Sequence, residues 1–296
     1  MEKKRPLLSS CLIAALVLVF LVGLSLITLT WWKKDSTFWA SKDKVGVIEI
    51  NGLITKSLPV LKNLRKFSEE KHIKAIVVRI DSPGGAVGPS QEIMREIEKV
   101  RKQKKVVASL GTVAASGGYY VACAADLIMS NPGTATGSIG VIMRLANVEE
   151  LVKKLGIDFQ TLQAGELKDL GSPFRHMTPE ERAVLQTLLN DIHQQFIADI
   201  ARNRKLPLEK VKKLADGRVY TGQSAKELGL VDELGNFEDA VEKAGRLGGI
   251  VGKVETVFPE KRRSLLSFLL GQDVQESLTN LALPYPEPAF LPPWFR

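Results

Sequence analysis

The stretch "KVVASLGTVAASGGYYVACAA", residues 105–125, combines a strand, a turn and a helix in one run of small and apolar residues. Residues 105–110 predict a buried strand. "AASGGYY" follows at 114–120, and its paired glycines are typical of a tight turn before a helix. We therefore expect Ser116 to lie where a strand ends and a helix begins.

Two more strands are predicted upstream, at "KVGVIEI" (44–50) and "IKAIVVRI" (73–80). Before residue 105, Ile93, Ile97 and Val100 recur at the spacing of one helix face. Strand, helix and strand in this order indicate a right-handed parallel crossover. The predicted fold class is α/β, with a parallel sheet and flanking helices.

Downstream, residues 126–130 and 157–163 predict further strands, the second after a helical segment at 147–156. A capping box, formed by Thr178 with Pro179 and Glu181, predicts the start of the longest helix. Its expected buried stripe is Val184, Leu188, Ile192, Phe196 and Ile200. Residues 217–249 predict a small strand and two helices, whereas five prolines in "LPYPEPAFLPPWFR" exclude a regular element from 283–296.

The N-terminal segment 6–32 contains no charged residue and is long enough to cross a hydrocarbon core of about 30 Å as a helix. Lys3, Lys4 and Arg5 precede it, which favours a cytoplasmic N-terminus and an extracytoplasmic remainder. We expect an uncleaved signal anchor in contact with membrane lipid; a cleaved signal peptide is the alternative.

The expected domains are the cytoplasmic N-terminus with its transmembrane anchor (1–35), a linker (36–43), the main domain (44–250) and a C-terminal tail (251–296).

Composition excludes several classes of function. The net charge is +8, but basic and acidic residues are mixed, and no nucleic-acid-binding motif occurs. We therefore expect no nucleic-acid partner. No metal-ligand spacing, phosphate-binding loop or dinucleotide motif is found, so no metal and no cofactor are expected.

Three segments could carry chemistry. "DSPGGAV" (81–87) follows a strand, and its glycines can expose a backbone N–H to an oxyanion. Ser116 lies at a helix N-terminus, where the Gly117 amide favours developing negative charge. "GELKDLGSPFR" (165–175) places Lys168 among leucines, and a lysine can act as a base only if burial lowers its pKa.

Each segment also has an ordinary interpretation, as a turn, a packing site for small residues or an exposed lysine. A Ser–His–Asp triad is open only through His176, which has no evident acidic partner in the sequence.

Taken together, "DSPGG", "AASGGYYVACAAD", "TGSIGV" (136–141), "GELKDLGSPFR", "MTPEER" and "DGRVYTGQSAKELGLVDELG" resemble the bacterial signal peptide peptidase A family, also called protease IV, in its short single-domain form. The resemblance runs from about residue 44 to 245.

It implies a Clp-protease/crotonase-like fold and a membrane-bound serine endopeptidase with a Ser–Lys dyad. Ser116 matches the nucleophile, Lys168 the general base and Ser138 a serine that positions the lysine, while the amides of Gly85 and Gly117 would form the oxyanion hole.

The resemblance also implies a substrate, partners and a location. The substrate would be hydrophobic remnant signal peptides, cut in a bacterial cell (inner) membrane, and the enzyme would be a ring-like homo-oligomer. Two alternatives stay open: a crotonase-type acyl-CoA enzyme, and a catalytically inactive membrane-anchored scaffold.

Overall fold

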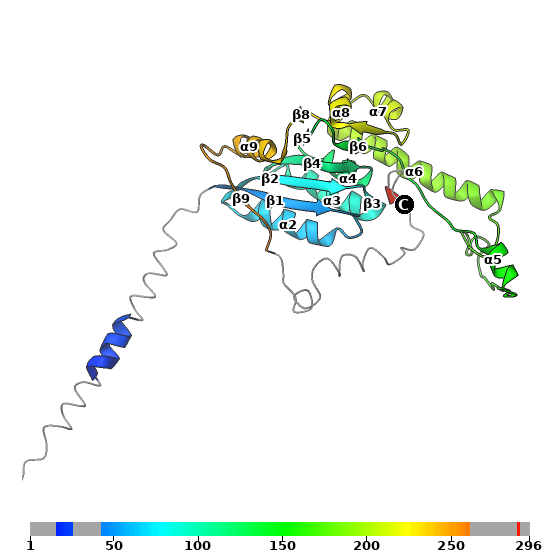
Figure 1. Ribbon diagram of the computed structural model, residues 1–296, viewed down its shortest axis with the longest axis horizontal. Helices are drawn as coiled ribbons and strands as arrows, with labels where there is room; N and C mark the ends of the chain where they lie inside the picture. The colour runs from blue at the N-terminus through cyan, green and yellow to red at the C-terminus, as the bar shows by residue number, and fades with distance from the viewer. Residues whose placement is uncertain (1–15, 26–42, 261–288, 291–296) are drawn as a thin grey trace, which may run out of the picture. The chain divides into compact units, whose positions relative to one another are not determined.

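Strand β4, Lys105–Ala115, pairs with three other strands in the computed structural model of this chain (Figure 1). The structure describes residues 16–25, 43–260 and 289–290. The chain divides into two compact units, Met1–Lys42 and Asp43–Arg296.

In the first unit, residues 16–25 are helical. The rest of the expected span at 6–32, and residues 36–42 of the expected linker, lie outside the described residues. Within the described part of the chain, no helix combines the length and the apolarity needed to cross a membrane.

The second unit holds the sheet and its helices. Its other elements, in chain order, are β1 (Lys44–Asn51), α2 (Leu58–Glu69), β2 (Ile73–Ser82), β3 (Gly85–Ala86), α3 (Val87–Val100), α4 (Gly117–Ala122), β5 (Leu127–Ser130), β6 (Ala135–Gly137), α5 (Glu149–Lys154), α6 (Pro179–Arg204), α7 (Leu208–Leu214), β7 (Val219–Thr221), α8 (Gly222–Leu228), β8 (Glu233–Leu234), α9 (Phe237–Leu247), β9 (Glu255–Val257) and β10 (Ala289–Phe290).

The parallel crossover predicted from the sequence is confirmed. β1, β2 and β4 are parallel neighbours, and α3 connects β2 and β3 to β4. The sheet runs β7-β6-β4-β2-β1-β9, with β5 and β8 branching from β4. β6 and β7 form an antiparallel pair, so the sheet is mostly parallel.

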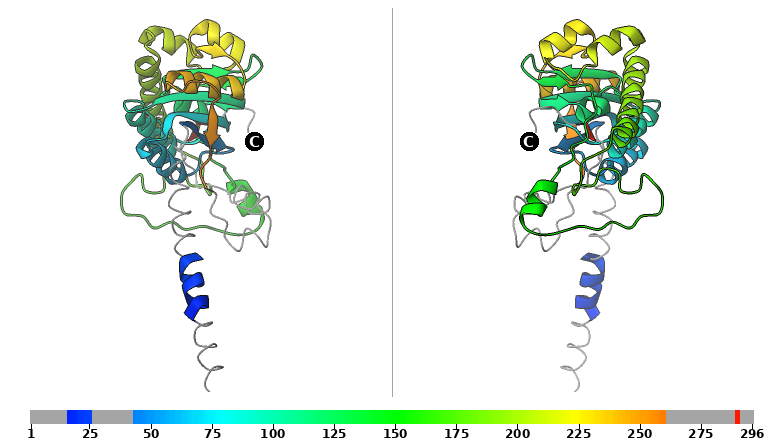
Figure 2. Two further views of the ribbon diagram at one scale, coloured as in Figure 1. Left: turned by 90° about the vertical axis from the view of Figure 1, so that its left-hand side faces the viewer. Right: turned by 90° about the vertical axis from the view of Figure 1, so that its right-hand side faces the viewer.

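Helices cover both faces of the sheet, as Figures 1 and 2 show. Alternate residues of one strand enter different cores, because successive side chains of a strand point to opposite faces. In β1, Val45 and Val47 pack with α9, whereas Ile48 and Ile50 belong to the larger core, which α2, α3, α4 and α6 complete. Burial on both faces explains the continuous apolar runs of β1 and β2.

The long helix α6 begins as predicted, with Thr178 and Glu181 forming a capping box. The prediction of its buried stripe is only half right. Ile192, Phe196 and Ile200 are buried, whereas Val184 and Leu188 are about two-fifths exposed. The first half of α6 extends beyond the sheet in Figure 1, which agrees with this exposure.

The strand predicted at 157–163 is wrong. These residues pair with no strand among those that the structure describes, and they are exposed. They belong to residues 143–178, which we call the arm; it contains α5 and extends away from the sheet (Figures 1 and 2). A strand requires a neighbour to satisfy its backbone groups, and the arm offers none.

Two features lie in the C-terminal part. β9 lies beyond the expected boundary at residue 250 and pairs with β1 in the sheet. Prolines do not exclude every regular element after residue 283, because β10 lies between Pro288 and Pro292 and pairs antiparallel with β3. Neither residue of β10 is a proline, so both can take part in the pairing.

The two halves of the α6 stripe predict different mutational costs. Phe196 is fully buried and its ring meets Tyr120 edge-on, with 4.5 Å between the ring centroids. Phe196→Ala should lower the free energy of unfolding by about 3–5 kcal/mol, because it leaves a cavity. Leu188→Ala, on the exposed half, should cost far less in the same urea titration. Equal losses for both variants would contradict the described burial.

Candidate active site

Ser116 follows the last residue of β4 and is the N-cap of α4, as expected. Its φ of 53° and ψ of −116° are rare for a non-glycine residue. The surrounding backbone holds it there: the Ser116 amide donates to the Gly137 carbonyl at 2.7 Å, and its carbonyl accepts from the Tyr120 amide at 2.8 Å. Such strain, about 1–3 kcal/mol, is concentrated at functional sites.

The Ser116 hydroxyl is buried and unpaired. The residue is 0% exposed, and its Oγ has no hydrogen-bond partner among the residues that the structure describes. A buried hydroxyl left without a partner costs about 1–3 kcal/mol. An exception of this kind points to a reactive group rather than to a packing residue.

Gly85 and Gly117 lie on backbones that touch each other. A Cβ added to Gly117 would lie 2.8 Å from Ser90 Oγ and 3.2 Å from the Gly85 nitrogen, so a side chain at this position would require its neighbours to shift. A Cβ on Gly85 would collide with the Ile54 carbonyl oxygen. The structure therefore brings both predicted oxyanion-hole residues next to Ser116.

Asp81 is a residue of this site that the sequence reasoning missed. Its carboxylate accepts hydrogen bonds from the amides of Val113 (3.1 Å) and Thr112 (3.3 Å), where the pairing of β2 with β4 is irregular. These hydrogen bonds fix the end of β4, just before Ser116. The feature of the sequence that could have identified Asp81 is its place as the first residue of "DSPGG", directly after the predicted strand at 73–80.

Ser138 is the neighbour of Ser116 across the sheet. Ala115 pairs with Gly137 at the ends of β4 and β6, so Ser116 and Ser138 are the first residues after two adjacent strands. Ser138 is 3% exposed and has a φ of 50°. It lines a hollow of about 350 Å³ whose other lining residues come from 140–142, from α6 and from 215–217. The role expected of Ser138, to position Lys168, stays a prediction.

Lys168 lies apart from the other four predicted residues. It is on the arm, its side chain is exposed, and it lines a shallow hollow whose other residues are all in 159–174. Within the described chain, no hydrogen bond or ion pair joins its ammonium group to Ser116 or Ser138. The desolvation that the sequence interpretation required is therefore absent from a single copy of this chain.

The histidines do not complete a triad in this chain. His176 has an acidic partner that the sequence did not reveal, since its Nδ1 lies 2.6 Å from Glu149 Oε2, but both residues are on the arm. Lys153 and His176 hydrogen-bond to Glu149 and lower its pKa to about 2. Over the described residues, no group of three His, Cys, Asp or Glu side chains could hold a metal ion.

Comparison with known proteins agrees with these motifs. Residues 98–250 match the model of peptidase family S49, and residues 43–134 match that of Clp protease. A solved ClpP1 variant from Listeria monocytogenes aligns with a TM-score of 0.45 at 20% identity, over 66% of this chain and 94% of its own. The Clp protease match and the parallel crossovers identify an α/β fold of the Clp-protease/crotonase kind.

Among curated relatives, a protein of Synechocystis named as a candidate protease is 46% identical over 86% of this chain and 91% of its own. A candidate signal peptide peptidase of Enterococcus faecium is 32% identical, over 80% of this chain and 73% of its own. A chloroplastic serine protease of Arabidopsis thaliana is 34% identical, over 71% of this chain but 33% of its own.

The close contact at Gly85 predicts that alanine at this position disturbs the site far more than alanine at Gly88. Gly85→Ala should abolish covalent labelling of Ser116 by a fluorophosphonate, because the new methyl group must push β3 away from Ile54. Gly88→Ala is the matched control, since nothing lies within 4 Å of its added Cβ and it is in helix α3. Labelling that survives Gly85→Ala at the wild-type rate would show that this backbone is not needed.

Proposed function

The chain belongs to peptidase family S49, a family of serine proteases, and we propose that it is a membrane-bound endopeptidase that degrades remnant signal peptides with a Ser116–Lys168 dyad. The observation that carries the proposal is the buried, unpaired Ser116 hydroxyl beside two glycine backbones at the N-terminus of α4.

The proposed mechanism uses the lysine as a proton carrier. Neutral Lys168, held by Ser138, takes the proton from Ser116 Oγ as this oxygen attacks a peptide carbonyl. The Gly85 and Gly117 amides stabilise the tetrahedral oxyanion. Lys168 then gives its proton to the leaving amine, and water hydrolyses the acyl-enzyme.

The edge of β3 supports a peptide as the substrate. One edge of this strand is fixed to Ile54, whose amide donates to the Gly84 carbonyl and whose carbonyl accepts from the Ala86 amide. The other edge pairs antiparallel with β10, so that residue 290 lies opposite Gly85. An edge that accepts a strand of this chain can accept an extended substrate in the same way.

The apolar N-terminal segment supports the substrate class and the location. Residues 6–32 are uncharged, and an anchor of this kind would keep the protease at the membrane that retains hydrophobic signal peptides. We propose a bacterial cell membrane, with the catalytic domain outside the cytoplasm. The name of the Enterococcus faecium relative points to the same substrate.

A homo-oligomer would resolve the separation of Lys168 from Ser116. Large apolar side chains of the arm are exposed within the part of the chain that the structure describes: Leu151, Leu155, Ile157, Phe159, Leu162, Leu167 and Phe174. Exposed apolar groups in such number are typical of a protein interface. We propose that the arm packs on a second copy of the chain and brings Lys168 to that copy's Ser116, closing into a ring.

The dyad itself is tested on a hydrophobic peptide. Ser116→Ala and Lys168→Ala should each abolish cleavage, because one removes the nucleophile and the other its base, while the thermal unfolding of both proteins stays close to that of the wild type. His176→Ala is the control and should retain cleavage. Normal turnover by the Lys168→Ala protein would exclude the dyad, and loss of turnover in the His176→Ala protein would favour a triad.

Mixing the two inactive variants tests the assembly. If Lys168 serves the Ser116 of a neighbouring copy, oligomers re-formed from equal amounts of Ser116→Ala and Lys168→Ala chains contain some intact pairs. Cleavage should then return to a fraction of the wild-type rate. A mixture that exchanges subunits but stays inactive would place both residues of the dyad in one chain.

A further inference from the structure

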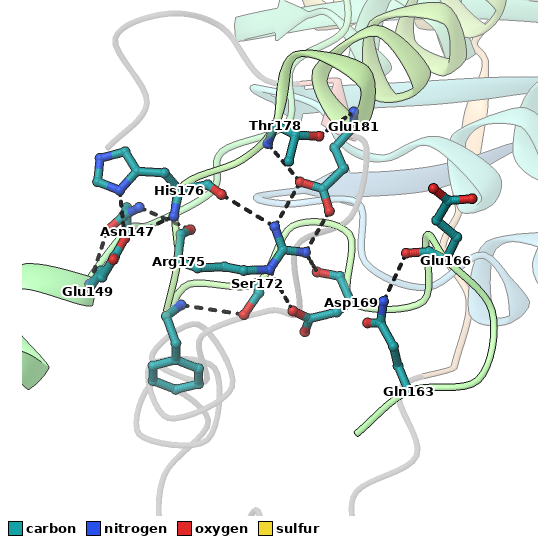
Figure 3. Close-up of polar contacts among 11 residues, drawn as sticks. Asn147, Glu149, Gln163, Glu166, Asp169, Ser172, Arg175, His176, Thr178 and Glu181 are labelled. Carbon is teal, nitrogen blue, oxygen red and sulfur yellow. Dashed lines mark hydrogen bonds and ion pairs between the residues drawn. The ribbon is translucent and has the colours of Figure 1, made fainter. Parts of the chain in front are cut away.

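Arg175 is the centre of a cluster of charged groups on the arm (Figure 3). Its Nη1 and Nη2 donate to the two carboxylate oxygens of Glu181, at 2.9 and 2.6 Å. Its Nε donates to Asp169 Oδ2 at 2.8 Å, and Nη2 also donates to the Asp169 carbonyl at 3.0 Å. Nη1 also donates to the His176 carbonyl at 3.3 Å, so one guanidinium group binds two carboxylates and two backbone carbonyls.

The cluster ties the arm to the first turn of α6. Glu181 is buried and its carboxylate also accepts from the Thr178 amide at 2.8 Å, as part of the capping box. Arg175 and the Thr178 amide lower the pKa of Glu181 to about 2, and Glu181 and Asp169 raise the pKa of Arg175. Both groups are therefore charged at neutral pH, and the charge-assisted fork is intact there.

The same cluster fixes the residue that follows Lys168. Arg175 holds both the carboxylate and the carbonyl of Asp169. Three backbone hydrogen bonds of 3.0–3.2 Å form successive turns around Asp169. In them the amides of Lys168, Leu170 and Ser172 donate to the carbonyls of Gly165, Leu167 and Asp169, respectively. The backbone that carries Lys168 is thereby held in one conformation, although its side chain is exposed.

Arg175 also offsets the charge nearest to the lysine. Asp169 is the one other charged residue lining the hollow beside Lys168 in the described chain. A free carboxylate at this place would favour the ammonium form, which cannot accept a proton. A second, larger hollow lies beside the first and is lined by five charged residues: Glu166, Asp169, Arg175, Glu180 and Glu181.

We infer that Arg175 is a positioning residue for Lys168: through Asp169 and Glu181 it holds the lysine backbone in place and offsets the Asp169 charge. The inference rests on the proposed role of Lys168 as the general base. A displacement of the base by about 1 Å can lower the rate on the order of 10²-fold, so loss of the contact between Arg175 and Glu181 should lower kcat.

The first variant separates geometry from charge. Arg175→Lys keeps the positive charge but cannot form the two-pronged contact with Glu181. We expect kcat on a hydrophobic peptide to fall by about 10- to 100-fold with KM nearly unchanged, and the pH at which kcat/KM falls on the acid side to stay where it is. Arg65→Lys is the matched control, because Arg65 pairs with Glu96 between α2 and α3, off the arm, and kcat should not change.

A second pair of variants tests the charge. Arg175→Gln leaves the Asp169 carboxylate without its counter-charge, so the acid-side fall of kcat/KM should move to higher pH. Adding Asp169→Asn removes that carboxylate, and the fall should return toward the wild-type pH while kcat stays low. A role limited to stabilising the arm would lower kcat without moving the pH profile.

The size of the oligomer and the thermal unfolding are measured for every variant, so that loss of assembly is recognised. Unchanged kcat in Arg175→Lys, or a pH profile that does not move in Arg175→Gln, overturns the inference, and so does a loss of kcat that only follows loss of assembly. If the wild type cleaves the peptide no faster than the Lys168→Ala protein, the proposed dyad fails instead, whatever Arg175 does.

Discussion

The backbone conformation of Ser116 is the constraint on which the rest of the site depends. A serine at a φ of 53° persists only when its neighbours leave no alternative. Here the carbonyl of Gly137 binds its amide from the adjacent strand, and the first turn of α4 binds its carbonyl. The glycine at 117 lets α4 approach Ser90 and the Gly84–Gly85 backbone closely, because a Cβ there would lie 2.8–3.2 Å from them. The small residues therefore shape the site, and do not merely fill the core.

The structure divides the candidate machinery between a rigid and a projecting part. Ser116, Gly85, Gly117 and Ser138 are buried and lie at or next to the ends of β4, β3 and β6, where backbone contacts between these elements fix their positions. Lys168 lies on the arm, whose apolar side chains remain exposed in a single chain. In the assembly that we propose, contact between copies would both cover these side chains and take the lysine out of water. Catalysis would then depend on assembly, because the copy that supplies the lysine would also supply the contact that covers it.

Within the arm, order comes from charge rather than from an apolar core. The guanidinium of Arg175 joins the loop that carries Lys168 to the capped start of α6 through Asp169 and Glu181. Bidentate contacts of this kind fix direction as well as distance, which a hydrophobic contact does not. A segment that has no sheet to lie on can present a side chain in a defined direction by this means.

By itself the sequence determined the elements whose signals are local. The strands at 44–50, 73–80 and 105–110, the helix face of Ile93 and Ile97, and the capping box at Thr178 all follow from periodicity or from contacts within a few residues. The place of Ser116 between a strand and a helix also follows from its glycine neighbours.

Only the tertiary structure decided which apolar surfaces are covered. Residues 157–163 are predicted as a strand but have no described strand beside them, and Leu188 repeats like a core residue but is exposed. The contacts of Asp81 with β4, of Arg175 with Glu181 and of β10 with β3 depend likewise on how the chain returns on itself. Periodicity reports that a face is apolar, whereas burial requires a partner, and the partner is set by the fold or by another copy.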